Sequence, residues 1–299
     1  MNEHSITAII LTYNEEIHLQ RCIDSLRLIC NRIIVVDSFS TDLTEEIAKS
    51  NNVEFKQNPW LNHATQFNWG LDNCDIISTW ILRMDADEYL SNELIEELNQ
   101  NLSIISENVN GITFPLRRVF LGKEIKRGTG NIRLLRLFKN GKGRSENRWM
   151  DEHILLESGD ILDYKYPFSD DNLNNLSWWT QKHVGYAIRE AIDLLNIELD
   201  LFEGLNIKKS ISKQAGIKRA LKFSYAKKPL FLRSFIYFIY RYIIKLGFLE
   251  GKEGFLWHFL QGWWYRTLVD VHIYEIKKKC GNDVSKIKDY IKTVHHIDI

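Results

Sequence analysis

Residues 80–90, WILRMDADEYL, join an apolar run to three closely spaced carboxylates. The run has the composition of a buried β-strand, and Asp85, Asp87 and Glu88 stand at its end. Carboxylates this close together repel one another and lose solvation when they are buried. We therefore expect a positive group to compensate them.

The sequence around this stretch alternates short β-branched runs with amphipathic segments. Strands are predicted over residues 5–14, 31–38, 53–57 and 80–86, and helical segments over residues 15–29, 40–50, 64–74 and 91–102, the last with Ser91 as its N-cap. Such alternation predicts an α/β fold with a mostly parallel sheet and flanking helices. Because ligands bind at the carboxyl ends of parallel strands, residues 11–16, 35–42 and 83–89 should converge on one site.

The pattern changes after the first hundred residues. From Gly111 to about Glu157 the sequence predicts strands and turns, which favours an antiparallel extension of the sheet, and from residue 177 it looks helical. We place a domain boundary near residue 170. Residues 1–170 form the predicted α/β domain, and residues 171–299 form a helical, basic and aromatic C-terminal region.

Composition limits the possible environments of the chain. It has 299 residues, of which 44% are hydrophobic, enough for a sizeable core. Its four cysteines form no CxxC pair or zinc-site spacing, which favours a reducing compartment. No basic start followed by an apolar h-region opens the sequence, so we expect a cytoplasmic protein.

The formal net charge of zero conceals an uneven distribution. Residues 1–110 carry 18 Asp and Glu against 6 Lys and Arg, whereas residues 207–248 carry 11 Lys and Arg and no acid. The acidic part could hold a metal or form a solvated surface. The basic part could meet an anionic membrane, a nucleic acid or another subunit.

The D-x-D pattern of Asp85 and Asp87 suits a hard divalent cation. Two carboxylates at a strand end can both turn toward Mg²⁺ or Mn²⁺, which would hold a diphosphate and stabilise its departing oxygen. The alternative is a solvated loop leading to the Ser91 cap, and the motif alone does not decide between them.

Two further strand ends carry polar side chains. The first is followed by Thr12, Tyr13, Asn14 and Glu15, at a helix start with free backbone N–H groups. The second ends at Asp37, which could accept hydrogen bonds from a base or ribose. Simple helix capping by Asn14 or Thr41 is the alternative.

Taken together, the segments AIILTYNEEIHLQRCIDSL, IIVVDSFSTDLTEEIAK, ATQFNWGL and WILRMDADEYL resemble the donor-binding half of family 2 inverting glycosyltransferases, which have the GT-A fold. The motif order and the LDADE-like form resemble the lipopolysaccharide core glucosyltransferase subgroup. The resemblance covers about residues 5–160. It implies a donor half over about residues 1–110 and an acceptor half over about residues 111–170.

The resemblance also implies roles for individual residues. Asp37 would hold the uracil or ribose of a UDP-sugar, Asp85 would lie near the sugar and diphosphate, and Asp87 would be the main ligand of Mg²⁺ or Mn²⁺. The nucleotide pocket would be lined by Thr12, Tyr13, Asn14, Glu15, Gln66 and Asn68. Many relatives have a basic residue near Gln66, and Ser38 replaces the second acid of the commoner VVDDGSTD, so base recognition departs from the family pattern.

Direct displacement at the anomeric carbon requires a general base for the acceptor hydroxyl. The segment RWMDEHILLES resembles the family's short acidic segment after an RLFR-type strand, and we favour Glu152 as the base, with Asp151 second. An ordinary charged strand entry is the alternative. Arg133 and Arg136, three apart in a predicted strand, should face opposite sides, so that only one points into the cleft.

The C-terminal region contains PLFLRSFIYFIYRYIIKLGF, residues 229–248, in which Arg233, Tyr237, Arg241 and Lys245 recur every four residues. This spacing predicts one cationic stripe on a helix that lies in an anionic membrane interface, while the uncharged runs are too short to span a bilayer. A packed helical subdomain is the alternative. We expect no nucleic-acid binding, since no such motif accompanies the lysines.

These features together predict a glycosyltransferase, peripheral on the inner face of a cell membrane. It would move a hexose with inversion from a nucleotide-diphosphate sugar to a lipid-linked or lipopolysaccharide acceptor of the cell envelope. The alternatives are a sugar nucleotidyltransferase, for which the expected glycine-rich phosphate loop is missing, and a non-catalytic scaffold that binds nucleotide or membrane. The sequence leaves the sugar, the acceptor and the oligomeric state open.

Overall fold

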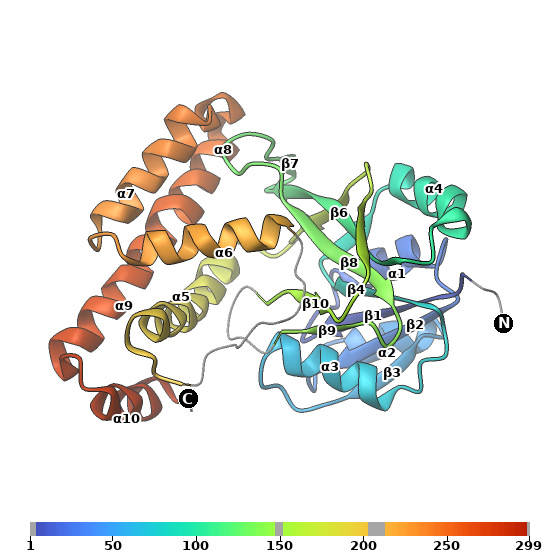
Figure 1. The fold of residues 1–299 in the computed structure, drawn as a ribbon, viewed down its shortest axis with the longest axis horizontal. Coiled ribbons are helices and arrows are strands. Elements are labelled where there is room, and N and C mark those ends of the chain that lie inside the picture. Colours follow the sequence, from blue (N-terminus) through green and yellow to red (C-terminus); the bar gives the residue numbers. More distant parts are fainter. Residues whose placement is uncertain (1–3, 147–151, 203–212, 298–299) are drawn as a thin grey trace. The chain divides into compact units, whose positions relative to one another are not determined.

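The computed structural model describes residues 4–146, 152–202 and 213–297. Its contacts divide them into two compact units (Figure 1). The first contains most of the chain up to Leu173, and the second contains Ile125–Gly130 and most of the chain from Asn174 onward. Each unit is described by itself.

Four parallel strands form the start of the first unit's sheet. They are β1 (Ile6–Thr12), β2 (Arg32–Asp37), β3 (Glu54–Gln57) and β4 (Trp80–Asp85), in the order β3-β2-β1-β4. The register pairs Thr12 with Asp37 and Leu11 with Asp85, so these strands end at one edge of the sheet.

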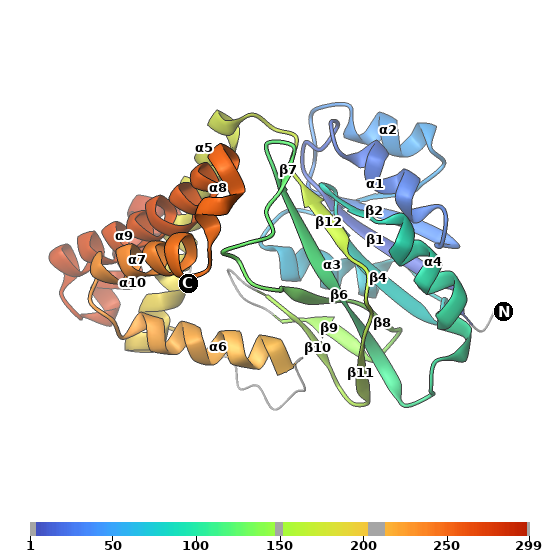
Figure 2. The same ribbon diagram turned by 90° about the horizontal axis from the view of Figure 1, so that it is seen from above.

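Helices cover both faces of these strands: α1 (Leu19–Leu26), α2 (Thr44–Ser50), α3 (His63–Asn73) and α4 (Asn92–Asn101), followed by the short η1 (Leu102–Ile104). Alternate side chains of β1 point to opposite faces, as a strand requires. Ala8 and Ile10 pack with α1 and α4, while Ile9 and Leu11 pack with α3 (Figure 2). Ser91 caps α4 by accepting the Leu94 N–H, as predicted.

The second part of the sheet is antiparallel where it joins β4, which confirms the expected extension. Strand β8 (Arg133–Lys139) lies antiparallel between β4 and β6 (Val109–Phe120). The remaining strands are β5 (Glu88–Leu90), β7 (Lys123–Glu124), β11 (Asp160–Asp163) and β12 (Phe168–Asp171), with a separate hairpin of β9 (Gly143–Ser145) and β10 (Ile154–Leu156). The sheet as a whole is therefore mixed, since β11 and β12 also pair in parallel with β6.

The second unit is helical. It contains α5 (Leu176–Leu199), α6 (Lys213–Ala226), α7 (Leu232–Ile239), η2 (Tyr240–Ile244), η3 (Gly247–Glu250), α8 (Gly251–Trp257), η4 (His258–Trp264), α9 (Tyr265–Cys280) and α10 (Val284–His295). Its core joins α5, α9 and α10 through side chains such as Ile192, Val269 and Ile287. Among the described residues, no helix combines the length and apolar character needed to cross a bilayer.

The prediction of an exposed cationic stripe on this unit is wrong. Arg233 and Arg241 are buried, and only Lys245 of the three cations is exposed. Arg233 forms an ion pair with Asp270 of α9, and Arg241 lies over the ring of Tyr237. The four-residue spacing identified one helix face correctly, but that face points into the unit.

Candidate active site

The carboxyl ends of β1, β2 and β4 bring the predicted site segments to one edge of the sheet. Thr12, Asp37 and Asp85 are the last residues of these three strands. Because the strands are parallel neighbours, their ends meet there without help from any loop. The expected convergence of the three segments is confirmed.

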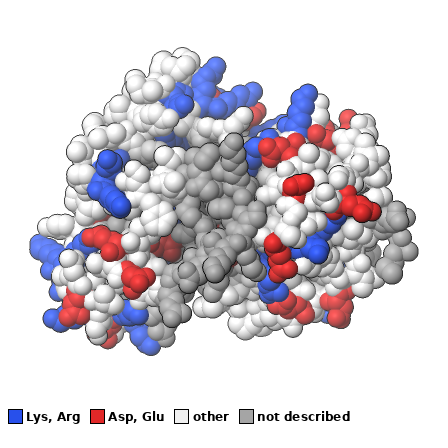
Figure 3. Space-filling model, viewed as in Figure 1, with Lys and Arg blue, Asp and Glu red and all other residues white. Residues whose placement is uncertain are grey.

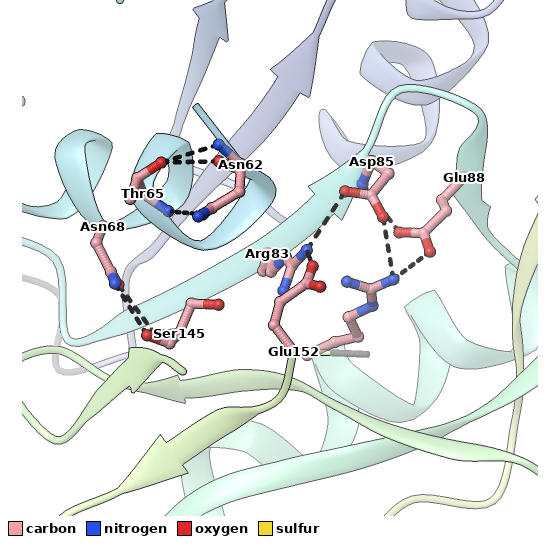
Figure 4. Close-up of polar contacts among 9 residues, drawn as sticks. Asn62, Thr65, Asn68, Arg83, Asp85, Glu88, Ser145 and Glu152 are labelled. Atoms are coloured by element: carbon pink, nitrogen blue, oxygen red, sulfur yellow. Dashed lines mark hydrogen bonds and ion pairs between the residues drawn. The ribbon is translucent and has the colours of Figure 1, made fainter. Parts of the chain in front are cut away.

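Two buried arginines compensate the acidic cluster at the end of β4. Antiparallel pairing of β4 with β8 reaches Leu82 and Leu137, and this brings Arg83 and Arg136 close to one another. The Nη2 atom of Arg136 bonds Glu88 and lies 3.5 Å from Asp85 Oδ2. The Nη2 atom of Arg83 lies 3.9 Å from Asp85 Oδ1 (Figure 4). The positive charge predicted from the sequence is therefore supplied, at least in part, by the protein.

Negative charge nevertheless remains in excess. Burial raises the pKa of Glu88 well above its ordinary value despite the charge of Arg136. Burial and the charge of Asp87 raise the pKa of Asp170 on β12 to about 6. Carboxyl groups with raised pKa values mark a place where another cation would be favoured.

Asp87 lies on the turn between β4 and β5, where β12 also ends. Its Oδ2 accepts a hydrogen bond from Asn172 Nδ2 at 3.1 Å, and its carbonyl accepts the Asp171 N–H at 3.1 Å. Arg21 of α1 fixes the same turn through a 2.6 Å ion pair with Asp171. The other carboxylate oxygen of Asp87, Oδ1, accepts no hydrogen bond from the described residues.

The oxygen donors of Asp85 and Asp87 fit a hard cation such as Mg²⁺ or Mn²⁺ in chemical type and in charge. Within residues 4–146, 152–202 and 213–297, no three acidic, histidine or cysteine side chains converge as a complete metal site. A cation held by these two aspartates would therefore need further oxygen ligands, which a diphosphate can provide.

Asp37 is completely buried and ties two loops together. Its Oδ1 accepts the Thr12 hydroxyl at 2.8 Å, and its Oδ2 accepts the Ser40 N–H at 2.8 Å. Asn14, with a φ of 54°, donates its N–H to Ser40 Oγ and accepts the Thr41 N–H, each at 2.8 Å. Neither Asn14 nor Thr41 is a helix N-cap, since His18 and Leu43 hold those positions. These polar residues instead shape the rim of the strand ends.

The side chains beside Asn14 differ in exposure. Tyr13 is 58% exposed and available for stacking on a ligand. Glu15 instead faces the buried His18, with its Oε2 atom 2.5 Å from His18 Nδ1, and its backbone N–H bonds Thr44 Oγ1. Among the predicted pocket residues of this loop, Tyr13 and Asn14 are the exposed ones.

Gln66 and Asn68 of α3 both make internal contacts. Gln66 is fully buried, donates to Ser38 Oγ at 3.0 Å and accepts from Asn58 Nδ2 at 2.8 Å. Asn68 exchanges two 2.9 Å hydrogen bonds with the backbone of Ser145 on β9 (Figure 4). Gln66 thus supports the loop after β2, while Asn68 holds the hairpin that leads toward Glu152.

Glu152 points toward the acidic cluster, and Arg83 lies between them. Arg83 Nη2 bonds Glu152 Oε1 at 2.7 Å while it also faces Asp85 (Figure 4). Burial acts to raise the pKa of Glu152, but the charges of Arg83 and His63 outweigh it, so the pKa is lowered. Glu152 is therefore ionised at neutral pH. Asp151, the second candidate base, lies outside the described residues.

Arg83 is the site residue that sequence reasoning missed. It is only 5% exposed and interrupts the apolar strand WILRMD, where a charge is costly unless it is paired. That interruption was the available signal. Of the two arginines on β8, Arg136 reaches the acids, whereas Arg133 bonds Thr113 and the Tyr164 carbonyl, as their expected opposite orientations require.

Comparisons with known proteins agree on the family. Residues 7–152 match the model of glycosyl transferase family 2. The lipopolysaccharide core biosynthesis glycosyltransferase LpsC of Rhizobium meliloti is 34% identical over 148 residues, 46% of this chain and 52% of that protein. An uncharacterized glycosyltransferase of Rickettsia bellii is 42% identical over 93 residues, 31% of each chain. The matches thus span between about a third and a half of these relatives.

Among solved structures, glucosyl-3-phosphoglycerate synthase from Mycobacterium tuberculosis, in complex with Mn²⁺, uridine diphosphate and glucosyl-3-phosphoglycerate, overlaps 40% of this chain and 45% of that one. The sequence identity is 19% and the TM-score is 0.31. The mixed sheet, its flanking helices and the motifs at its strand ends agree with the family match. Residues 7–152 therefore form a glycosyl transferase family 2 domain, with a fold of the GT-A type.

Proposed function

We propose that the protein transfers a hexose from a nucleotide-diphosphate sugar, with UDP as the nucleotide, to a lipid-linked or lipopolysaccharide acceptor. The observation that carries the proposal is the meeting of Asp85 and Glu152 at Arg83, with Asp87 on the turn that follows Asp85, in a domain of this family. One strand end thereby offers both a place for a diphosphate and an ionised carboxylate for the acceptor.

Asp87 is the proposed main ligand of Mg²⁺ or Mn²⁺, with Asp85 assisting. The bound cation would supply Lewis-acid stabilisation of the leaving diphosphate. Arg83 and Arg136 pair with Asp85 and orient its carboxylate beside that position. Asn172 orients Asp87 through its 3.1 Å hydrogen bond.

The nucleotide is proposed to bind over the loops after β1 and β2. Tyr13 and Asn14 are exposed there and can contact it directly. Thr12, Asp37, Glu15 and Gln66 hold the two loops in shape through the contacts described above. Asn68 contributes by anchoring the β9–β10 hairpin, which places Glu152.

Glu152 is the proposed general base of an inverting displacement. The acceptor oxygen would form its bond to the anomeric carbon as the bond from that carbon to the diphosphate oxygen breaks, and the acceptor proton would pass to Glu152. The lowered pKa of Glu152 ensures that its carboxylate is ready to accept a proton at neutral pH. Arg83 orients this carboxylate through the 2.7 Å ion pair.

The acceptor proposal is supported by the similarity to LpsC, whose name describes lipopolysaccharide core biosynthesis. Such an acceptor is carried by a membrane lipid. We therefore propose that the protein works on the cytoplasmic face of the cell membrane as a peripheral enzyme.

Calorimetric titration with a panel of nucleoside diphosphates tests the donor site, with Mn²⁺ and with chelator. We expect one nucleotide to bind in a metal-dependent manner and to lose that binding in Asp87→Asn. The matched control is Asp24→Asn on the exposed surface of α1, which should bind normally. Absence of nucleotide binding by folded wild-type protein would overturn the donor site.

Product analysis then separates the reaction classes. A glycosyltransferase releases a nucleoside diphosphate from a nucleotide sugar when the acceptor is present. A sugar nucleotidyltransferase would release pyrophosphate from a nucleoside triphosphate and a sugar phosphate, and a scaffold would bind without turnover. Either of the last two results would contradict the proposal.

A further inference from the structure

The helical unit carries an extended exposed apolar surface on α7, η2, η3 and the start of α8. We call it the apolar face, and its most prominent side chains are Phe235, Ile236, Ile239, Ile243, Ile244 and Leu249. Ile236 is 57% exposed and Ile244 is 65% exposed. Large side chains that cluster in this way on a water-facing surface usually mark an interaction site.

The apolar side chains point outward because the inner side of these elements is already filled. Arg233 and Ser234 face α9, where Arg233 bonds Asp270 and Ser234 Oγ lies 3.0 Å from Thr267 Oγ1. Phe238 stacks on Trp263 with ring centroids 5.4 Å apart. The usual arrangement of an amphipathic helix is thus inverted, with charged residues inside and aliphatic residues outside.

Charge along the apolar face is mostly positive, although the half-buried Glu253 lies in the first turn of α8. Residues 229–249 contain no Asp or Glu. The next acid, Glu250, is buried and accepts the Arg127 N–H at 2.9 Å. Lys245 and Lys252 are exposed at this surface. In Figure 3 the surface over α7 and α8 is mostly uncharged, with basic side chains at its border.

We propose that the apolar face inserts into the interfacial region of an anionic phospholipid membrane. Aliphatic and aromatic side chains would enter the boundary between headgroups and acyl chains, while Lys245 and Lys252 would contact lipid phosphates. A second copy of the chain would bring these lysines together across a two-fold interface, whereas anionic lipid neutralises them. The absence of acids from residues 229–249, which carry most of the apolar face, thus favours lipid as the occupant.

The inference deepens the proposed function by giving the membrane contact a location and a physical basis. It also changes that basis, since the sequence predicted a cationic stripe that included Arg233 and Arg241, and both are buried. Its test does not depend on transferase activity, so its failure and that of the proposed glycosyl transfer are distinguishable.

The test is co-sedimentation of the full chain with vesicles of phosphatidylcholine containing roughly a third phosphatidylglycerol. The variant Ile236→Asp/Ile244→Asp should bind on the order of tenfold more weakly or worse, because two apolar side chains no longer enter the interface. The matched control is Ile77→Asp/Ile104→Asp, which makes the same change at residues that are 80% and 78% exposed in the first unit. This control should bind like the wild type.

A second variant distinguishes insertion from adsorption. Ile236→Lys/Ile244→Lys adds positive charge to the apolar face, so it should still lose binding to pure phosphatidylcholine vesicles if insertion drives contact. Stronger binding of this variant to anionic vesicles, with no loss on neutral ones, would overturn insertion. Equal binding by the wild type and the aspartate variant would also overturn it.

Sedimentation equilibrium without vesicles tests the other occupant. We expect the wild type and the aspartate variant to have the same mass. A wild-type dimer that the aspartate substitutions dissociate, together with absence of vesicle binding, would assign the face to a second copy and overturn the membrane proposal.

Discussion

Both units bury arginine beside aspartate, but they do so in different ways. In the helical unit, Asp270 accepts Nε and Nη2 of Arg233, and its second oxygen accepts the Phe231 N–H. In the α/β unit, the Nε atoms of Arg83 and Arg136 have no acceptor among the described residues, although both side chains are as deeply buried.

The balance of charge distinguishes the structural ion pair from the candidate site. One arginine and one aspartate satisfy each other in the helical unit, where Ala226 also accepts from Arg233 at 2.9 Å. At the end of β4, two arginines face more acids than they can neutralise, and the pKa of Asp170 is raised to about 6 by burial and the charge of Asp87. Breaking a closed pair destabilises the fold, whereas an incompletely compensated cluster can respond to a ligand.

The largest expected effect is on activity, in Glu152→Gln. If the α/β cluster is catalytic, loss of the base should reduce kcat by about 10² to 10⁴-fold, with a smaller loss of stability than in Asp270→Asn because Asp85 remains 3.9 Å from Arg83. Steady-state kinetics and thermal unfolding measure the two quantities. Glu157→Gln, an exposed glutamate of the same region, is the control and should retain full activity. A fully active Glu152→Gln enzyme would remove Glu152 from the mechanism.

Breaking the Arg233–Asp270 pair of the helical unit should instead affect mainly stability. Asp270→Asn leaves the Arg233 guanidinium buried without its counter-charge, so we expect a loss of about 3–5 kcal/mol in the free energy of unfolding. Urea denaturation followed by tryptophan fluorescence measures it. The same substitution at Asp72, which pairs with Arg144 at the surface, should cost less than about 1 kcal/mol. Similar losses in both variants would contradict a special role of the buried pair.

Acid should weaken the helical unit first. Burial lowers the pKa of His183 and of His258 to about 4, below the unfolded value near 6.5. Each neutral histidine therefore contributes stability that is present above pH 6.5 and is lost as the pH falls to about 4, by up to about 3 kcal/mol.

The contribution of Asp170 to the stability of the α/β unit depends on pH in the opposite direction. Its raised pKa gives a contribution that is present at low pH and is lost as the pH rises through about 6. Hydrogen exchange at pH 7 and pH 5, corrected for intrinsic rates, should therefore show a larger loss of protection at pH 5 in α5 and α9 than in β1 and β4. His183→Gln should reduce this pH dependence, and earlier opening of the sheet would contradict the assignment.

The smallest expected effect is that of Arg83→Gln, on the order of tenfold in kcat/KM at neutral pH. Without the Arg83 charge, burial should raise the pKa of Glu152, so the acidic limb of the pH–rate profile should move to higher pH. Arg83→Lys keeps the charge and should partly restore the profile. An unchanged acidic limb in Arg83→Gln would show that Arg83 does not act through Glu152.

Much of the α/β unit could be predicted because its strands and helices are specified by patterns in neighbouring residues of the sequence. The β-branched runs form β1, β2 and β4, and parallel pairing brings Thr12, Asp37 and Asp85 to one edge. The short strands β5 and β12 were not predicted, since each is stabilised by pairing with a strand distant in sequence. The same holds for the roles of Gln66 and Asn68, whose partners are set by packing.

The sequence by itself determined the alternation of β1 to β4 with their helices, the family of residues 7–152 and the acidic strand end. Only the tertiary structure decided which charges meet. Arg83 reaches Glu152 across 69 positions, and Arg233 reaches Asp270 across 37. The physical reason is that periodicity specifies a face of an element, whereas its partner depends on which other elements bury that face. For that reason the spacing of Arg233 and Arg241 identified a helix face correctly and its direction wrongly.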